Sequence, residues 1–134
     1  MPTNFEATVD IKLSSKSGAD WQYGLCVSDT YTTTYTGTNQ CFNYHNYNRC
    51  ALGCRVNGSL SNYGAVNSVG TEEWYTFSIK VEGTSVTSKM MNGSTVVYTT
   101  TQTLSNIQSW KKIMLIIGGT ATQIQMKNYK VKPL

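Results

Sequence analysis

Tyrosine, asparagine and arginine side chains crowd the segment between residues 31 and 63, and these residue types can bind neutral sugars. An aromatic ring packs against the apolar face of a sugar, and tyrosine adds a polar hydroxyl at its tip. Planar amides and carboxylates bond to sugar hydroxyls. The candidate ligand-binding residues are Tyr31, Tyr35, Tyr44, His45, Tyr47 and Arg49, with Trp74 as an exposed aromatic platform. The same residue types are enriched in protein-binding surfaces, so a protein ligand stays open. A third interpretation is a loop folded over one end of the domain with its rings buried.

Few side chains are available for catalysis. Glycosidases need two carboxylates that face one sugar, and the chain has seven acidic residues. Glu72 and Glu73 are neighbours, which would point to opposite faces of a strand. His45 is the single histidine, and no nucleophile-elbow motif accompanies it. The sequence therefore predicts a protein that is not an enzyme. It leaves His45 with two interpretations, a ligand contact or an ordinary hydrogen-bonding loop residue.

The four cysteines are Cys26, Cys41, Cys50 and Cys54. Zinc sites favour cysteine pairs separated by two to four residues, a spacing that Cys50 and Cys54 alone satisfy. On a strand, these two would lie more than about 10 Å apart, too far for one tetrahedral ion. Disulfides and buried free thiols both remain open. Calcium needs six to eight oxygen ligands, and the chain has no Asp-rich loop. The sequence thus predicts no metal site and no cofactor, and it leaves calcium open without support.

Composition excludes several classes of protein. Charged residues make up 13% of the 134 residues, against about 25% in average domains. The net charge is +4, but lysine and arginine are scattered, whereas nucleic-acid-binding proteins cluster them on one face. No run of about 18 apolar residues is present that would span a membrane. We therefore expect one domain over residues 1–134, with no nucleic-acid partner and no membrane insertion.

Strand patterns dominate the chain. Residues 4–14 alternate apolar and polar types, as in a half-buried strand, and residues 14–18 then indicate a turn. Alternation and turn residues predict further strands over residues 21–28, 50–56, 73–82, 85–91, 95–101 and 122–131. A short strand is expected over residues 41–44, where the alternation fails, and residues 113–117 are apolar on both faces, as in a central strand. The strand over residues 122–131 changes its apolar phase near Lys127-Asn128, which predicts a bulge. Residues 104–110 are the single candidate for a helical turn.

Turn residues separate these strands. Asn57-Gly58 and Asn92-Gly93 are typical of type I′ hairpins, whose two central residues both need positive φ. Gly118-Gly119 indicates another turn. Eight or nine strands joined by such turns favour an all-β, antiparallel sandwich or barrel, and half-buried alternation favours two sheets packed face to face.

Several segments resemble the concanavalin A-like (laminin G-like) lectin superfamily. The segments are the run from Glu73 to Thr84, the run Met91-Asn92-Gly93-Ser94, the run Val96-Val97-Tyr98, and the strands Phe5–Leu13, Ile113–Gly119 and Ile124–Val131. The resemblance implies a jelly-roll β-sandwich that binds carbohydrate or protein at its loops or on a concave face. Members occur in secreted enzymes, adhesins and phage tail proteins.

The resemblance and the candidate residues together predict a non-catalytic, lectin-like module that recognises surface glycans, as part of a phage tail or adhesin. The alternative is a structural protein of a virion that uses the fold for subunit contacts, and a small glycosidase ranks below both. The expected partners are a glycan or cell-surface polysaccharide, or other virion or adhesin subunits. We expect an extracellular or virion location, although Met1-Pro2-Thr3-Asn4 leads into a strand with no secretory signal pattern.

Overall fold

The computed structural model describes residues 3–31 and 38–134, which form an all-β, antiparallel structure. The strands are β1 (Phe5–Ser28), β2 (Gln40–Asn46), β3 (Arg49–Val56), β4 (Ser59–Asn67), β5 (Trp74–Glu82), β6 (Ser85–Asn92), β7 (Thr95–Thr103) and β8 (Lys112–Pro133). A single 3₁₀ turn, η1 (Ile107–Ser109), lies between β7 and β8 in this described part, inside the segment where a helical turn was expected.

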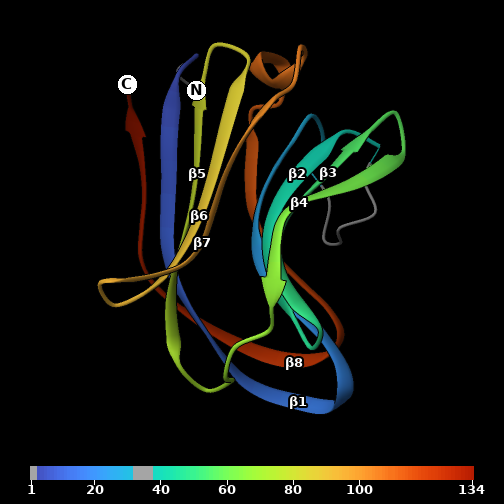
Figure 1. Cartoon of the computed structure of the whole chain (residues 1–134), viewed down its shortest axis with the longest axis vertical. Coiled ribbons are helices and arrows are strands. Elements are labelled where there is room, and N and C mark those ends of the chain that lie inside the picture. The colour runs from blue at the N-terminus through green and yellow to red at the C-terminus, as the bar shows by residue number, and fades with distance from the viewer. Residues whose placement is uncertain (1–2, 32–37) are drawn as a thin grey trace.

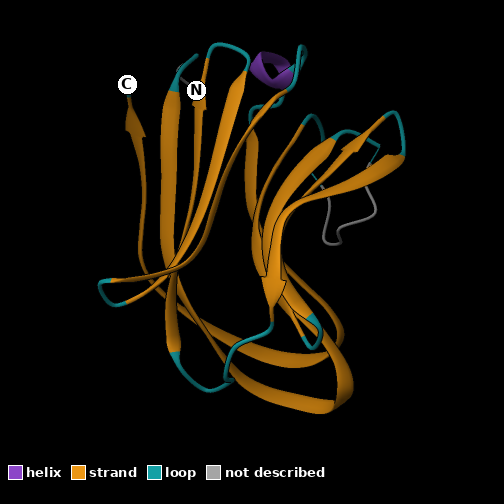
Figure 2. Cartoon of the chain, viewed as in Figure 1, coloured by secondary structure: helices purple, strands orange, loops and turns teal. Residues whose placement is uncertain are grey.

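Two long strands, β1 and β8, bend together and so fold the sheet into two layers (Figures 1 and 2). The hydrogen-bonded order is β4-β3-β2-β1-β5-β6-β7, with β8 paired to β1. Residues 5–12 of β1 pair with β5, and residues 22–28 pair with β2. We call the layer containing β5, β6 and β7 the first sheet, and the layer containing β2, β3 and β4 the second sheet.

The predicted turns at residues 14–18 and at Gly118-Gly119 are wrong, because both strands continue through the bend. The residues of β1 in the bend are exposed and mostly polar. The pairing of β1 with β8 shifts register there, between Leu13 and Trp21. Gly119 has a φ of 59°, and a Cβ on it would meet the carbonyl of Asp20. A polar stretch with a glycine at the closest approach thus bends a strand rather than ending it.

The apolar alternation of the sequence lies between the two sheets. Phe5, Ala7, Val9, Ile11 and Leu13 are all buried in the main core. Tyr23 and Phe77 meet across the layers, with ring centroids 5.6 Å apart. The expected half-buried strands are confirmed for this inner face.

The outer face of the second sheet differs from that expectation. Cys26, Phe42, Tyr44, Ala51 and Ile116 form a separate buried cluster there. The second sheet is therefore apolar at the centre of both faces, which its sequence pattern did not indicate.

The position of glycine in each hairpin determines the type of its turn. At Asn57-Gly58 both residues have positive φ, 51° and 85°, which confirms the type I′ prediction. The next predicted turn lies one residue later than expected, because Asn92 pairs with Thr95 and leaves Gly93 as the first central residue. Gly93 has a φ of 60°, as a type II′ turn requires.

The bulge near the end of β8 is confirmed. Asn128 has a φ of 56°, and the β1–β8 register shifts between Thr8 and Asp10, which face Lys130 and Lys127. Strand β4 was missed, because it is exposed at nearly every position and so has no apolar face to detect. No helix among the described residues is long and apolar enough to cross a membrane.

Candidate functional site

A groove lies on the outer face of the second sheet, with a volume of about 210 Å³. Four strands supply its lining: Gln22 from β1; Phe42, Tyr44 and Asn46 from β2; Arg49 and Arg55 from β3; and Leu60 and Asn62 from β4. We call it the second-sheet groove. Aromatic rings, amides and guanidinium groups meet here, and these are the groups that the sequence suggested for sugar binding.

Strand pairing explains why these residues share one face. Gln22 pairs with Asn46, and Phe42 pairs with Gly53, which pairs in turn with Asn62. Side chains at alternate positions of a strand share a face, so Tyr44 joins Phe42 and Asn46. This register places the aromatic side chains of Phe42 and Tyr44 at the centre of the groove and polar side chains at its ends.

Small residues hollow the groove. Gly53 lies opposite Phe42, and a Cβ at Gly53 would stand 2.6 Å from the Phe42 ring. Ala51 is the neighbour of Tyr44 across the same pair of strands. On the groove side of β3 only Ala51 and Gly53 lie between the two arginines, which leaves room for a depression beside the rings of β2.

Tyr44 is held firmly at the base of the groove. Its hydroxyl donates a 2.7 Å hydrogen bond to Oδ1 of Asn62, and its ring centroid lies 5.3 Å from that of Phe42. Burial raises the pKa of Tyr44, while the neighbouring Arg49 guanidinium acts in the opposite direction. A neutral phenol from β2 and an oriented amide from β4 therefore meet across β3, which lies between these two strands.

Asn46 fixes the turn that carries Arg49. Its side-chain Oδ1 accepts hydrogen bonds from the backbone N–H groups of Asn48 (2.8 Å) and Arg49 (2.7 Å). An asparagine that bonds to backbone two and three residues ahead stabilises a tight turn. These two bonds fix the start of β3, and therefore the backbone position of Arg49, in the protein without ligand.

Of the predicted site residues, Tyr44 and Arg49 line this groove. Tyr47 lies in the turn that joins β2 to β3 and is 54% exposed. Its backbone N–H donates to the carbonyl of Trp21 at 3.3 Å. Tyr47 is therefore near in sequence to the groove residues but is not part of the lining.

His45 lies on the opposite, inner face and is fully buried. Its Nδ1 is 2.8 Å from the Tyr23 hydroxyl, and its Nε2 is 3.1 Å from the carbonyl oxygen of Val69. A carbonyl can only accept, so Nε2 carries the proton and Nδ1 accepts from Tyr23. Burial lowers the pKa of His45 to about 4. The structure places His45 in the core, away from any ligand at the surface.

The remaining predicted residues are scattered. Tyr31 is 77% exposed after the end of β1, with the Lys112 ammonium 5.2 Å from its ring centroid. Tyr35 lies outside the described residues. Trp74 begins β5 on the first sheet, with the Lys127 ammonium 4.2 Å from its ring centroid. The structure does not bring the rings of Tyr31 and Trp74 into the second-sheet groove.

The site residues predicted from the sequence include two of the eight that line the groove. Asn46 and Asn62 lie in the segment between residues 31 and 63 that is rich in tyrosine and asparagine. No sequence pattern singled out the other four lining residues, which are Gln22, Phe42, Arg55 and Leu60. One local pattern could have found part of the lining: Phe42, Tyr44 and Asn46 share one face of a strand by alternation. The contributions of β1 and β4 depend on strand order, which alternation does not reveal.

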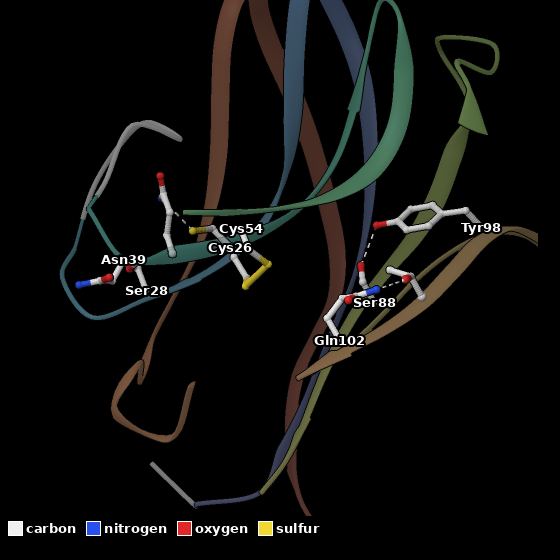
Figure 3. Close-up of a disulfide and its surroundings, with 10 residues drawn as sticks. Cys26, Ser28, Asn39, Cys54, Ser88, Tyr98 and Gln102 are labelled. Carbon is white, nitrogen blue, oxygen red and sulfur yellow. Dashed lines mark hydrogen bonds between the residues drawn. A yellow bond between two sulfur atoms is a disulfide. The ribbon is translucent and has the colours of Figure 1, made fainter. Parts of the chain in front are cut away.

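The register of β2 and β3 determines which cysteines form a disulfide. Cys41 and Cys54 face each other on these strands, with Cα atoms 4.2 Å apart, and form a disulfide. Cys26 and Cys50 are buried free thiols. Figure 3 shows the disulfide and, on a neighbouring strand, Cys26, whose sulfur accepts a hydrogen bond from Gln40. A disulfide is typical of proteins in oxidising surroundings, which supports an extracellular location.

Acidic residues lie away from the groove. None of its eight lining residues is an aspartate or a glutamate. Asp10, on the first sheet, accepts hydrogen bonds from Thr76 at 2.6 Å and Asn128 at 2.8 Å. No group of three or more His, Cys, Asp or Glu residues that could hold a metal ion occurs within residues 3–31 and 38–134.

Solved structures with this fold include proteins named for carbohydrate binding. The carbohydrate-binding module CBM66 of Bacillus subtilis matches 96% of the chain and 74% of its own length, with a TM-score of 0.64 and 12% identity. The galectin LEC-6 of Caenorhabditis elegans matches 98% of the chain and 84% of its own length, with a TM-score of 0.63 and 9% identity.

A third similar structure is the GH43 protein BlXynB of Bacillus licheniformis, at a TM-score of 0.73 and 8% identity. The match covers 98% of the chain but spans 28% of the length of BlXynB. No family model and no curated protein matches the sequence. At these identities the likeness establishes the fold, which the chain shares with lectins and carbohydrate-binding modules.

Proposed function

We propose that this protein is a non-catalytic carbohydrate-binding module that holds a glycan in the second-sheet groove. The observation that carries the proposal is the meeting of aromatic rings, amides and guanidinium groups in one depression of a fold shared with galectins and CBM66. Protein binding sites for small molecules combine apolar walls with a few placed polar groups, as this groove does.

Groove size sets the expected mode of binding. A volume of about 210 Å³ is below the roughly 300–1,000 Å³ of pockets that enclose drug-sized ligands. One sugar ring of a longer chain therefore sits in the depression, and its neighbours extend along the sheet. Tyr44 and Asn62, already bonded to each other, present a preorganised polar pair at little entropic cost. Several copies on one particle would raise the avidity of such a shallow site.

A matched pair of variants tests this function. Asn62→Ala removes the amide and the partner of Tyr44, whereas Asn106→Ala makes the same change at an exposed position before η1, far from the groove. Both variants are titrated calorimetrically with glycans selected on an array by the unaltered protein. We expect about 10-fold weaker binding for Asn62→Ala, the effect of about 1.4 kcal/mol, and unchanged binding for Asn106→Ala. Equal binding by both variants, with melting temperatures preserved, would place the site elsewhere.

The wider setting, as a piece of a phage tail or adhesin, remains a prediction, as does the virion assembly protein named as its alternative. One observation favours assembly: β8 pairs with β1 at the edge of both sheets and bears two exposed apolar residues, Met126 and Tyr129. Exposed strand edges pair readily with other chains. Sedimentation of the unaltered protein and of Met126→Lys separates the two settings, since assembly through this edge predicts oligomers that the lysine disrupts. A protein that is monomeric at every concentration would exclude assembly through this edge and leave the glycan-binding module as the remaining proposal.

A further inference from the structure

We infer that the glycan recognised by the second-sheet groove is anionic and carries a carboxylate or sulfate group. This inference rests on the proposed function and adds the chemical class of the ligand. It follows from the distribution of charge over the groove and the rest of the molecule, not from the fold.

Two cations and no anions line the groove. Arg49 begins β3 and Arg55 lies near its end, and both belong to the lining. The six residue steps of extended strand from Arg49 to Arg55 span roughly 20 Å. Phe42, Tyr44 and Asn62 lie between these two positive ends. A glycan lying along β3 therefore meets a guanidinium group at each end of the groove.

The acidic residues of the chain are placed elsewhere. Glu6 and Asp10 lie on the part of β1 that pairs with β5, and Glu82 ends β5. Glu72 and Glu73 immediately precede β5. All five belong to the first sheet or its approach, so none of them neutralises the groove.

The other two acids are also outside the lining. Asp20 lies in the exposed stretch where β1 bends, and Asp29, beyond the end of β1, accepts a 2.9 Å hydrogen bond from Asn39. In the described part of the chain, the one ion pair joins Lys80 to Glu82 on the first sheet, at 3.3 Å. The positive charge of Arg49 is therefore not balanced by a protein carboxylate within ion-pairing distance in that part of the chain.

A further cation shares this face. Lys112 on β8 pairs with Ser28, which pairs with Gln40, which pairs in turn with Arg55. Three strand spacings of about 4.8 Å put Lys112 roughly 14 Å from Arg55 across the sheet. Three cations on one face, at both ends of β3 and on β8, favour the approach of an extended polyanion.

Arginine chemistry makes the inference specific. The planar guanidinium group donates two parallel hydrogen bonds that match the geometry of a carboxylate or a sulfate. Hydrogen bonds to charged groups contribute more than those between neutral groups, especially in a partly desolvated depression. A neutral sugar offers these guanidinium groups hydroxyl oxygens, which accept hydrogen bonds about as well as the displaced water and less strongly than a carboxylate or sulfate.

The experiment compares chemically matched glycans. The unaltered protein is screened on an array of neutral, carboxylated and sulfated glycans, and each acidic glycan that binds is tested again in its carboxyl-reduced or desulfated form. We expect acidic glycans to bind about 10- to 100-fold more tightly than their neutralised forms. Binding should also weaken as salt rises from about 0.05 M to about 0.5 M.

Charge variants assign the effect to the groove. Arg49→Gln should lose most of the preference for the acidic form, Arg49→Lys should recover part of it, and Lys132→Gln, a charge removed at the far end of β8, should change little. Reduced or desulfated glycans that bind as well as the acidic ones would overturn the inference and leave the proposed function intact. An array with no binding glycan of any class would overturn the proposed function itself.

Discussion

Burial of the single histidine makes the stability of this protein depend on pH in a defined range. His45 is fully buried, and its Nε2–H donates to the carbonyl of Val69 while Nδ1 accepts from Tyr23. Protonation of Nδ1 would break the bond from Tyr23 and place a charge in the core. This is why burial lowers the pKa of His45 from 6.5 to about 4.

The direction of the pH effect follows from which state binds the proton. Between about pH 6.5 and pH 4 the unfolded chain is protonated at His45 and the folded chain is not. Acid therefore favours unfolding in this range, and the stability is fully present above it. With these two pKa values the free energy of unfolding falls by roughly 2 kcal/mol between about pH 7 and about pH 5. Ordinary carboxyl groups titrate mainly below about pH 5, so they contribute little to that interval.

Urea denaturation at the two pH values measures this loss. His45→Gln cannot titrate, so its free energy of unfolding should be lower at neutral pH but nearly unchanged between the two conditions. NMR titration of the imidazole in the folded protein gives an independent reading, with an expected pKa below about 5. The reasoning is refuted if the variant retains the full pH dependence, or if the imidazole titrates near its ordinary value of about 6.5.

Two further predictions concern the core around β2. Replacing both Cys41 and Cys54 with alanine should lower the free energy of unfolding by about 3 kcal/mol, because the bond closes a loop with a sequence separation of 13. Thiol titration of the unfolded, unreduced protein should find two of the four cysteines reactive, and four would contradict the pairing. Tyr98→Phe should cost about 1–3 kcal/mol, because the lost hydroxyl donates a 2.6 Å bond to buried Asn43. Thermal melts against Tyr129→Phe, at an exposed position, check this, and equal melting temperatures would count against the bond.

Local patterns in the sequence determined the strands and several turns. Apolar alternation identified residues 5–13 as half-buried, since a strand presents every second side chain to the same face. Asn57-Gly58 determined its own turn, because few other residue pairs adopt positive φ twice in succession. The fold class follows from such local preferences, which act over two to four residues and can be read directly.

Tertiary structure alone decided how those strands meet. The sequence indicated turns within β1 and β8, and packing kept both strands continuous through the bend. Pairing of β2 with β3 selected Cys41 and Cys54 as the bonded pair among the four cysteines and turned His45 into the core. The groove combines Gln22 from β1 with Asn62 from β4, and their separation in sequence is bridged only by strand order. Side-chain periodicity gives the face of each strand, whereas neighbours across a sheet depend on long-range register, which a local pattern does not contain.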